Sequence, residues 1–255
     1  AAESSPSVSA PQASSGSTIS IGKKTALASA QQYLNVMAFS YSGLIEQLEY
    51  EGYSGEDAAY AADNCGANWR EQAALSAVQY LRSMAFSKDG LIGQLEYEGF
   101  SHEDAVYAVD NCGADWKEQA VEKAKSYLEY SSFSYDGLIK QLEYEGFTHE
   151  EAVYGADHCS LDGSSQAVET AKAYLRYSSF SYDGLVEQLE YEGFSHEDAV
   201  YAVDNCGADW KEQAVEMAES YLSISTFSRS ELIRQLIYEG FTREQAEYGV
   251  EANGL

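Results

Sequence analysis

Proline is almost absent from this sequence. Its two prolines, Pro6 and Pro11, both lie in the first eleven residues of a 255-residue chain. Because proline breaks helices, the absence of proline after Pro11 leaves the rest of the chain free to form helices. Long apolar runs are missing as well: no stretch of about 18 consecutive apolar residues occurs, so the sequence encodes no membrane-spanning helix.

Basic residues are also scarce. The chain has 15 lysines and arginines against 42 aspartates and glutamates, a net charge of −27. The first 25 residues carry a net +1, so residues 26–255 carry −28. A field of that sign repels nucleic acid and anionic lipid and attracts basic partners. The alternative interpretation is that solvated acidic faces merely keep the chain soluble.

Motifs for catalysis are missing. The sequence has neither a glycine-rich phosphate loop nor an Asp-x-Asp-x-Asp calcium loop. His102, His149 and His196 pair with no serine or cysteine nucleophile in a recognisable motif, and their helical phase predicts an outward-facing position. The sequence therefore predicts no enzyme and no cofactor.

The cysteines are few and evenly spaced, at Cys65, Cys112, Cys159 and Cys206. Four cysteines allow three disulfide pairings. Equivalent positions in packed repeats lie ~8–10 Å apart or more, however, and a disulfide needs Cα atoms within ~7 Å. Ligands for zinc would cluster at short spacing, which these do not. We therefore expect free, buried thiols and no metal site.

What the sequence does contain is a repeat of 47 residues. Its clearest copy runs from Phe133 to Tyr154 and reads as two short helices joined by a turn at Gly146. The turn glycine recurs five times, at Gly52, Gly99, Gly146, Gly193 and Gly240. A fixed period in this range is typical of a tandem array of one small supersecondary unit.

Each repeat is predicted to hold three helices, so the fold class is an all-α tandem array of five three-helix, helix-turn-helix-like repeats of ~47 residues. Residues 1–25, rich in serine and alanine, are expected to form a flexible leader or tether. The repeats are predicted at residues 26–72, 73–119, 120–166, 167–213 and 214–255.

In the third repeat the first helix is predicted over residues 120–130, with small alanines that let a neighbouring helix approach closely. The second helix should begin after Ser134 as N-cap and end before Gly146. Thr148 and Glu151 form a capping box for the third helix. The stripe expected to be buried on the second helix is Leu138, Ile139, Leu142 and Tyr144.

One position within the repeat distinguishes the last copy. Four repeats have glycine in the first turn of the second helix, at Gly43, Gly90, Gly137 and Gly184, where the fifth has Glu231. Glu231 indicates that the backbone does not require glycine there. The four glycines are interpreted as making room for a close contact that the last repeat lacks.

The end of the third repeat breaks the pattern. Gly-Ala-Asp-Trp at Gly113–Trp116 and Gly207–Trp210 is replaced there by Ser160-Leu-Asp-Gly-Ser-Ser165. Because the tryptophan is lost, this segment is the candidate for a hinge between three repeats and two.

The candidate binding residues lie at the end of each second helix. A glutamate there is disfavoured by the helix dipole, by ~0.3–1 kcal/mol. The two explanations are a local hydrogen bond to the following turn and a row of acids presented to a partner. Tyrosine precedes each glutamate and is a common interface anchor, although most of these tyrosines are expected in the core. The candidates are Glu51, Glu98, Glu145, Glu192 and Glu239, with Tyr50, Tyr97, Tyr144, Tyr191 and Tyr238.

The glycine turn between the second and third helices suggests a helix-turn-helix, yet DNA binding is rejected. Recognition of phosphates needs lysine and arginine on the third helix. In the second repeat that helix carries His102, Glu103, Asp104 and Asp110 instead. The predicted partner is therefore a protein, expected to be basic, and not a nucleic acid.

These patterns resemble the Ltp-like family of host cell surface-exposed lipoproteins. The matching elements are Ala-x-x-x-Ala-x-x-Tyr-Leu, then Phe-Ser-x-x-Gly-Leu-Ile-x-Gln-Leu-x-x-Glu-Gly-Phe, then Ala-x-Tyr-Ala-Val-Asp-Asn. They cover nearly all of residues 26–255 and run from Ala167 to Cys206 in the fourth repeat. The resemblance implies small helical units in tandem, exported to the bacterial cell surface.

The resemblance also implies a function. Prophage-encoded members of the family act in superinfection exclusion: lipid-anchored outside the cell, they block DNA injection by an incoming phage, and the implied target is the phage tape measure protein. The leader of this chain has no lipobox cysteine, so a lipid anchor, the only membrane attachment implied, would belong to the precursor.

Two alternatives remain open. The first is a chromosomal cell-surface interaction or spacer protein unrelated to phage. The second is a ubiquitin-associated three-helix module, which the order of the Gly-Phe turn and the following alanine-rich helix faintly resembles. Modules of that kind bind ubiquitin through the Gly-Phe loop and the last helix.

Overall fold

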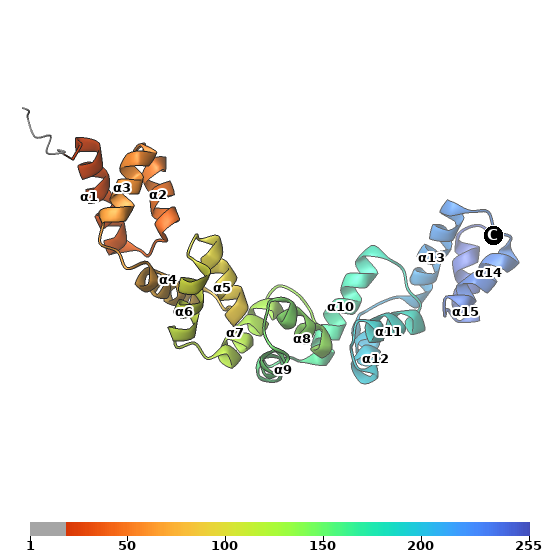
Figure 1. Ribbon diagram of the computed structural model, residues 1–255. Coiled ribbons are helices and arrows are strands. Elements are labelled where there is room, and N and C mark those ends of the chain that lie inside the picture. Colours follow the sequence, from red (N-terminus) through yellow and green to blue (C-terminus); the bar gives the residue numbers. More distant parts are fainter. Residues whose placement is uncertain (1–18) are drawn as a thin grey trace, which may run out of the picture. The chain divides into compact units, whose positions relative to one another are not determined.

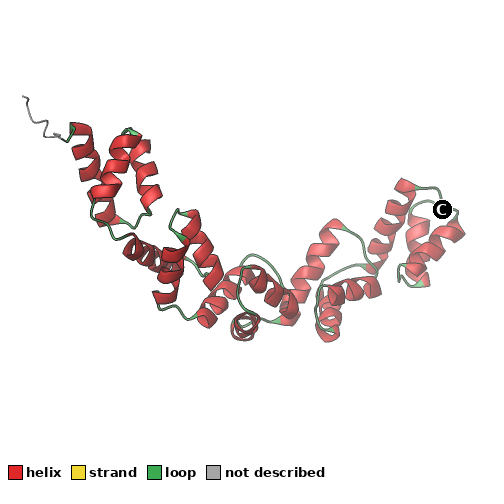
Figure 2. Ribbon diagram, viewed as in Figure 1, coloured by secondary structure: helices red, strands yellow, loops and turns green. Residues whose placement is uncertain are grey.

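The computed structural model describes residues 19–255, all of which lie in helices or in the loops that connect them, as Figure 2 shows. The first helices of the repeats are α1 (Ile21–Val36), α4 (Trp69–Ser83), α7 (Trp116–Leu128), α10 (Gly163–Tyr177) and α13 (Trp210–Ile224). The second helices are α2 (Tyr41–Tyr50), α5 (Lys88–Tyr97), α8 (Tyr135–Tyr144), α11 (Tyr182–Tyr191) and α14 (Arg229–Tyr238). The third helices are α3 (Gly55–Asn64), α6 (His102–Asn111), α9 (His149–His158), α12 (His196–Asn205) and α15 (Arg243–Ala252).

The all-α array of three-helix repeats is thereby confirmed. Helix α1 begins at Ile21, inside the segment expected to be a leader, because Ser20 caps it by accepting a hydrogen bond from the amide of Lys23. The remainder of the expected leader, residues 1–18, lies outside the described residues.

In the first, third, fourth and fifth repeats, the first and third helices pack along each other, and the second packs mainly on the third. Figure 1 shows this triplet in α13, α14 and α15. In the third repeat the core consists of Leu138, Ile139 and Leu142 from α8 against small residues of α7 and α9. A Cβ on Gly155 of α9 would lie 2.9 Å from the carbonyl oxygen of Ala120. The small residues thus permit the close helix approach that the sequence predicts.

The predicted caps are present. Ser134 accepts from the amide of Gly137 at the start of α8, and Thr148 and Glu151 form the capping box of α9. Gly146 has φ +90°, a left-handed conformation that suits glycine, and it directly follows the C-cap residue of α8. These contacts define both ends of the turn that carries the candidate residues.

Contacts divide the chain into two compact units. One comprises residues up to Ser76 with Leu95–Ala108, and the other comprises Ala77–Gln94 with Val109–Leu255. The division falls within the second repeat. The hinge expected at residues 160–165 is therefore not a unit boundary, because α9 and α10 both belong to the second unit. Among residues 19–255, no helix has the length and apolar character needed to cross a membrane.

Candidate functional site

The most exposed aromatic side chains of the site are the tyrosines that end the second helices. We call Tyr50, Tyr97, Tyr144, Tyr191 and Tyr238 the tyrosine row; their side chains are exposed to between 85% and 89%. The prediction that most of them lie in the core, and that Tyr144 belongs to the buried stripe of its helix, is wrong. Tyr144 follows Leu142 by two residues, about 200° around the helix, so it points away from the core.

The neighbouring glutamates are engaged within their own repeats. Each is the C-cap residue of its helix or directly follows the helix. In the first, third, fourth and fifth repeats its carboxylate accepts a hydrogen bond from a tyrosine of the first helix of the same repeat. The pairs that the structure describes are Tyr33 with Glu51, Tyr127 with Glu145, Tyr174 with Glu192 at 2.6 Å, and Tyr221 with Glu239 at 2.5 Å.

A glutamine strengthens these pairs. Gln188 Nε2 donates to the hydroxyl of Tyr174 at 3.1 Å and to Glu192 at 3.3 Å. In the fifth repeat Gln235 does the same for Tyr221 and Glu239. The partner is thus not the following turn, as the local explanation supposed, but the first helix.

Burial and this hydrogen-bond network shift the pKa values of Glu145 and Tyr127. Burial opposes ionisation of Glu145, but donation from Tyr127 and from Lys123, whose Nζ lies 2.9 Å away, outweighs it and lowers the pKa of the carboxyl. The pKa of Tyr127 is raised, first by burial and second by its hydrogen bond to Glu145. The carboxylate is therefore held ionised, and its charge is largely committed to closing the first helix onto the second.

The backbone of the same glutamate joins the repeat to the preceding one. In the second unit, Ser181 Oγ donates to the carbonyl oxygen of Glu239 at 2.5 Å, and Ser134 Oγ donates to that of Glu192 at 2.7 Å. Ser87 reaches Glu145 in the same way at 2.6 Å, and in the first unit Ser40 reaches Glu98 at 2.5 Å. Every Tyr-Glu-Gly turn after the first thus docks on the N-terminus of the preceding second helix.

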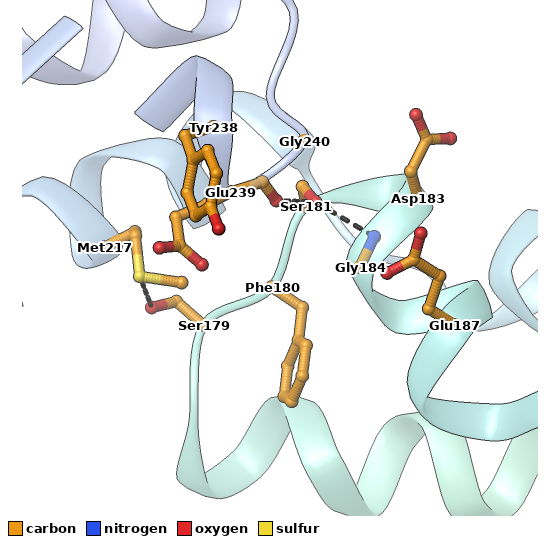
Figure 3. Close-up of a pocket in the computed structure, with 10 residues that line it drawn as sticks. All are labelled: Ser179, Phe180, Ser181, Asp183, Gly184, Glu187, Met217, Tyr238, Glu239 and Gly240. Atoms are coloured by element: carbon orange, nitrogen blue, oxygen red, sulfur yellow. Dashed lines mark hydrogen bonds between the residues drawn. The ribbon is translucent and has the colours of Figure 1, made fainter. Parts of the chain in front are cut away.

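A cavity of about 420 Å³ lies at one such junction, between the fourth and fifth repeats. Figure 3 shows the ring of Tyr238, with Met217 and Ser179, on one side of the cavity and the carboxylates of Asp183 and Glu187 on the other. An aromatic ring and carboxylates that line the same cavity suit a lysine or arginine side chain. The third repeat has Lys140 at the position equivalent to Glu187, so the combination of an aromatic ring with two carboxylates is not shared by all junctions.

The histidines lie on the surface as expected, whereas the cysteines only partly follow their prediction. His102, His149 and His196 have side chains 75% exposed, and each ring Nδ1 lies 2.6–2.8 Å from a glutamate of the preceding helix. The four cysteines are free, and Cys159 is buried with its thiol 3.3 Å from the carbonyl oxygen of Ala156. Cys65, Cys112 and Cys206 are only half-buried, so the prediction of buried thiols is wrong for these three. Within residues 19–255, no group of three or more histidine, cysteine and acidic side chains could hold a metal ion.

Comparison with known families accounts for the repeat. The family model described as "Host cell surface-exposed lipoprotein" matches five consecutive segments: residues 22–65, 68–112, 115–159, 162–206 and 209–252. The chain belongs to this family. No curated protein and no solved structure was matched. Each family match begins at the first helix of a repeat and ends after the third, so the family's unit and the structural repeat coincide.

The sequence did not reveal two sets of residues that hold the glutamates in place. The N-cap serines of the second helices and the first-helix tyrosines were not singled out as partners of the glutamates. The available signal was their 47-residue recurrence together with the glycine three residues after each serine. What the sequence could not supply was the pairing, because Ser134 and the carbonyl of Glu192 are 58 residues apart.

Proposed function

We propose that the chain is a non-enzymatic protein-binding array at the bacterial cell surface, which holds its partner through the tyrosine row. The supporting observation is the 85–89% exposure of five tyrosines at equivalent positions. A tyrosine ring contributes strongly to affinity once a partner buries it, and its hydroxyl can be satisfied at the same time. Repetition of the ring once per repeat would let several weak contacts add.

The proposed partner is a basic protein. Residues 26–255 carry a net charge of −28, and the cavity beside Tyr238 has two carboxylates that are not paired with a base in the described part of the chain, Asp183 and Glu187. Complementary charge speeds association and rejects acidic competitors. Under superinfection exclusion this partner is the tape measure protein of an incoming phage, and its capture blocks DNA injection.

The test is plaque formation on a bacterium that displays the lipid-anchored chain, challenged with a panel of tailed phages. We expect at least one phage to be excluded, and we expect the variant with Tyr144→Ala, Tyr191→Ala and Tyr238→Ala to restore its plaques. Tyrosines are better targets than the glutamates, because Glu145 and its equivalents also stabilise the repeat.

The matched control is the variant with Tyr130→Ala and Tyr177→Ala. These tyrosines are 84% and 88% exposed, but they lie at the C-terminal ends of the first helices: Tyr177 ends α10, and Tyr130 follows the end of α7 by two residues. Exclusion should persist in this control. If no phage of the panel is excluded, the role is a surface interaction or spacer function unrelated to phage. If the row variant still excludes phage, the tyrosine row is not the contact.

A further inference from the structure

Four of the five repeats contain the same internal ion pair. A basic residue in the first turn of the first helix contacts a glutamate in the first turn of the third helix and lies over the ring of a tyrosine one turn later. The sets are Lys23 with Glu56 and Tyr60, Arg70 with Glu103 and Tyr107, Lys117 with Glu150 and Tyr154, and Lys211 with Glu244 and Tyr248. The charged nitrogen lies 2.6–2.8 Å from the carboxylate.

The fourth repeat keeps this site but lacks the cation. Ser164 occupies the basic position and donates instead to Asp198, at 2.6 Å. Glu197 then has no ion pair or hydrogen bond from its side chain to any residue between 19 and 255. Tyr201 is 50% exposed, compared with 42% for Tyr248 under its lysine. A carboxylate and a ring are left where the other repeats hold a lysine or arginine.

The fourth repeat also lacks the tryptophan that precedes the basic residue in other repeats. Trp69 and Trp210 precede Arg70 and Lys211, and each packs edge-on against a tyrosine of the preceding repeat, with ring centroids 5.5 Å apart. The corresponding residue in the fourth repeat is Gly163. No indole therefore reaches Tyr135, the equivalent tyrosine of the third repeat.

Tyr135 nevertheless retains the position of its counterparts. Its hydroxyl donates to Asp157 at 2.7 Å, as that of Tyr182 does to Asp204 at 2.8 Å. Tyr135, Gly163 and Phe194 line a cavity of about 490 Å³. That volume is within the ~300–1,000 Å³ range of ligand pockets.

The cavity does not result from a loss of the hydrogen bonds that join the third repeat to the fourth. Ser134 Oγ donates to the carbonyl of Glu192 at 2.7 Å, and the amide of Phe133 donates to Gln166 at 3.2 Å. The corresponding bonds between the fourth and fifth repeats are 2.5 Å and 3.1 Å. The third and fourth repeats are therefore joined as usual, and only the two side chains are missing.

We propose that this place is a binding site for a partner-protein segment in which an aromatic residue is followed directly by lysine or arginine. We call it the open junction: Tyr135, Gly163, Ser164, Glu197 and Tyr201. The ring would pack on Tyr135 as Trp210 packs on Tyr182, and the cation would bridge Glu197 and Tyr201 as Lys211 bridges Glu244 and Tyr248.

The occupant is specified by what fills the same site elsewhere in the chain. Trp-Arg at Trp69–Arg70 and Trp-Lys at Trp210–Lys211 fill it, each indole packing on the equivalent tyrosine. Trp116–Lys117 repeats the Trp-Lys pair, although Lys88 stands there in place of the tyrosine. Residues 1–18 contain no aromatic and no basic residue, so they cannot supply it. The acidic surroundings, which include Asp136, Glu190 and Asp198, favour a cationic segment. This site goes beyond the tyrosine row and does not depend on it.

The test uses the peptide Asp-Trp-Lys-Glu-Gln with blocked ends, which copies residues 115–119, and the ¹⁵N-labelled full chain. We expect saturable shifts of the amide resonances of Gly163, Ser164, Glu197 and Tyr201. The control peptide Asp-Ala-Ala-Glu-Gln should cause none. The variant with Tyr144→Ala, Tyr191→Ala and Tyr238→Ala should respond like the wild type, which separates this site from the proposed function.

A filled variant supplies the matched protein control. Gly163→Trp with Ser164→Arg introduces the residues of the second repeat, where Trp69 and Arg70 coexist with Asp104, the equivalent of Asp198. It should bind the peptide at least about tenfold more weakly. Glu197→Gln changes one exposed side chain and should weaken binding about two- to fivefold.

Three outcomes would overturn the proposal. The first is the absence of shifts in the wild type up to the solubility limit of the peptide. The second is shifts of equal size at the equivalent positions of other repeats, or in the filled variant. The third is a concentration-dependent dimer in sedimentation that the filled variant abolishes, because it would assign the site to a second copy of the chain.

Discussion

At the scale of single residues, Ser160 carries backbone strain that its counterparts avoid. Its φ is +63°, whereas the equivalent glycines Gly66, Gly113, Gly207 and Gly254 have φ between +75° and +84°. All five follow the C-terminus of a third helix, where the chain turns toward the next repeat or its end. A left-handed conformation costs a side-chain-bearing residue ~1–2 kcal/mol relative to glycine.

We predict that Ser160→Gly raises the free energy of unfolding by about 1 kcal/mol, because it removes this strain without removing a hydrogen bond of the side chain. The reverse change, Gly207→Ser, should lower it by a similar amount at an equivalent turn. Urea denaturation followed by helical circular dichroism measures both. A loss of stability in Ser160→Gly would show that the serine contributes more than its conformation costs.

The pair of Tyr127 and Glu145 makes stability depend on pH. The folded state lowers the pKa of Glu145, so the pair stabilises the fold above the unfolded pKa of about 4.5. That contribution is lost as the pH falls through the lowered folded value.

We predict that Tyr127→Phe reduces the loss of stability of the chain below pH 4.5, because phenylalanine cannot donate to the carboxylate. The measurement is the thermal midpoint of wild type and variant between about pH 6 and pH 3, and the difference between them should shrink on acidification. A difference that is constant with pH would assign the effect of Tyr127 to packing alone.

At the scale of helices, one serine performs two tasks at each junction. Ser181 Oγ accepts from the amide of Gly184 at 3.0 Å, which caps α11, and donates to the carbonyl of Glu239 in the next repeat at 2.5 Å. A Cβ on Gly184 would lie 2.9 Å from that Oγ and 3.5 Å from the carbonyl oxygen. Glycine thus leaves room for the serine and the incoming turn together.

The last repeat supports this explanation. Glu231 replaces the glycine there, and Ser228 Oγ donates to the carboxylate of Glu231 at 2.6 Å; within residues 19–255 it does not donate to the carbonyl of a Tyr-Glu-Gly turn as the other four serines do. The interpretation drawn from the sequence, that the four glycines accommodate a contact the fifth repeat lacks, therefore agrees with the geometry.

We predict that Gly184→Ala destabilises the junction between the fourth and fifth repeats, even though alanine favours a helix over glycine by ~1 kcal/mol. The matched control is Gly93→Ala in α5, where a Cβ would meet nothing within 4 Å and the change should stabilise by about 0.5–1 kcal/mol. Hydrogen exchange of α14 and α15 reports the junction. Unchanged or slower exchange in Gly184→Ala would contradict the role given to the glycine.

At the scale of the whole molecule, charge opposes the fold. The 42 acidic residues exceed the 15 basic residues by 27, so many carboxylates repel one another without a compensating cation. The ion pairs present are mostly exposed, and such pairs contribute only ~0–1 kcal/mol each.

We predict that the thermal midpoint of the chain rises when sodium chloride is increased from about 10 mM to about 500 mM, because salt shortens the reach of this repulsion. Circular dichroism measures it. Repeating the titration with potassium fluoride separates screening from specific chloride binding. A midpoint that falls with salt would mean that the surface ion pairs outweigh the net charge.

The sequence alone determined the repeat, its three helices and most of their caps. These features follow from local chemistry: Ser134 and Thr148 as N-caps, Gly146 in a left-handed turn, and leucines at helical spacing all act within a few residues of themselves. The location of the candidate site, at the Tyr-Glu-Gly turn of each repeat, was predicted in the same way from the repeat, but the contacts of its residues were not.

Only the tertiary structure decided what the members of that site do. Tyr144 proved exposed, and Glu145 was found to be bound by Tyr127, 18 residues earlier. The cavity at the open junction is lined by Tyr135 of the third repeat together with Gly163 and Phe194 of the fourth. Such contacts depend on how helices pack after they form, and the local sequence preferences that specify each helix carry no information about which distant side chain will meet it.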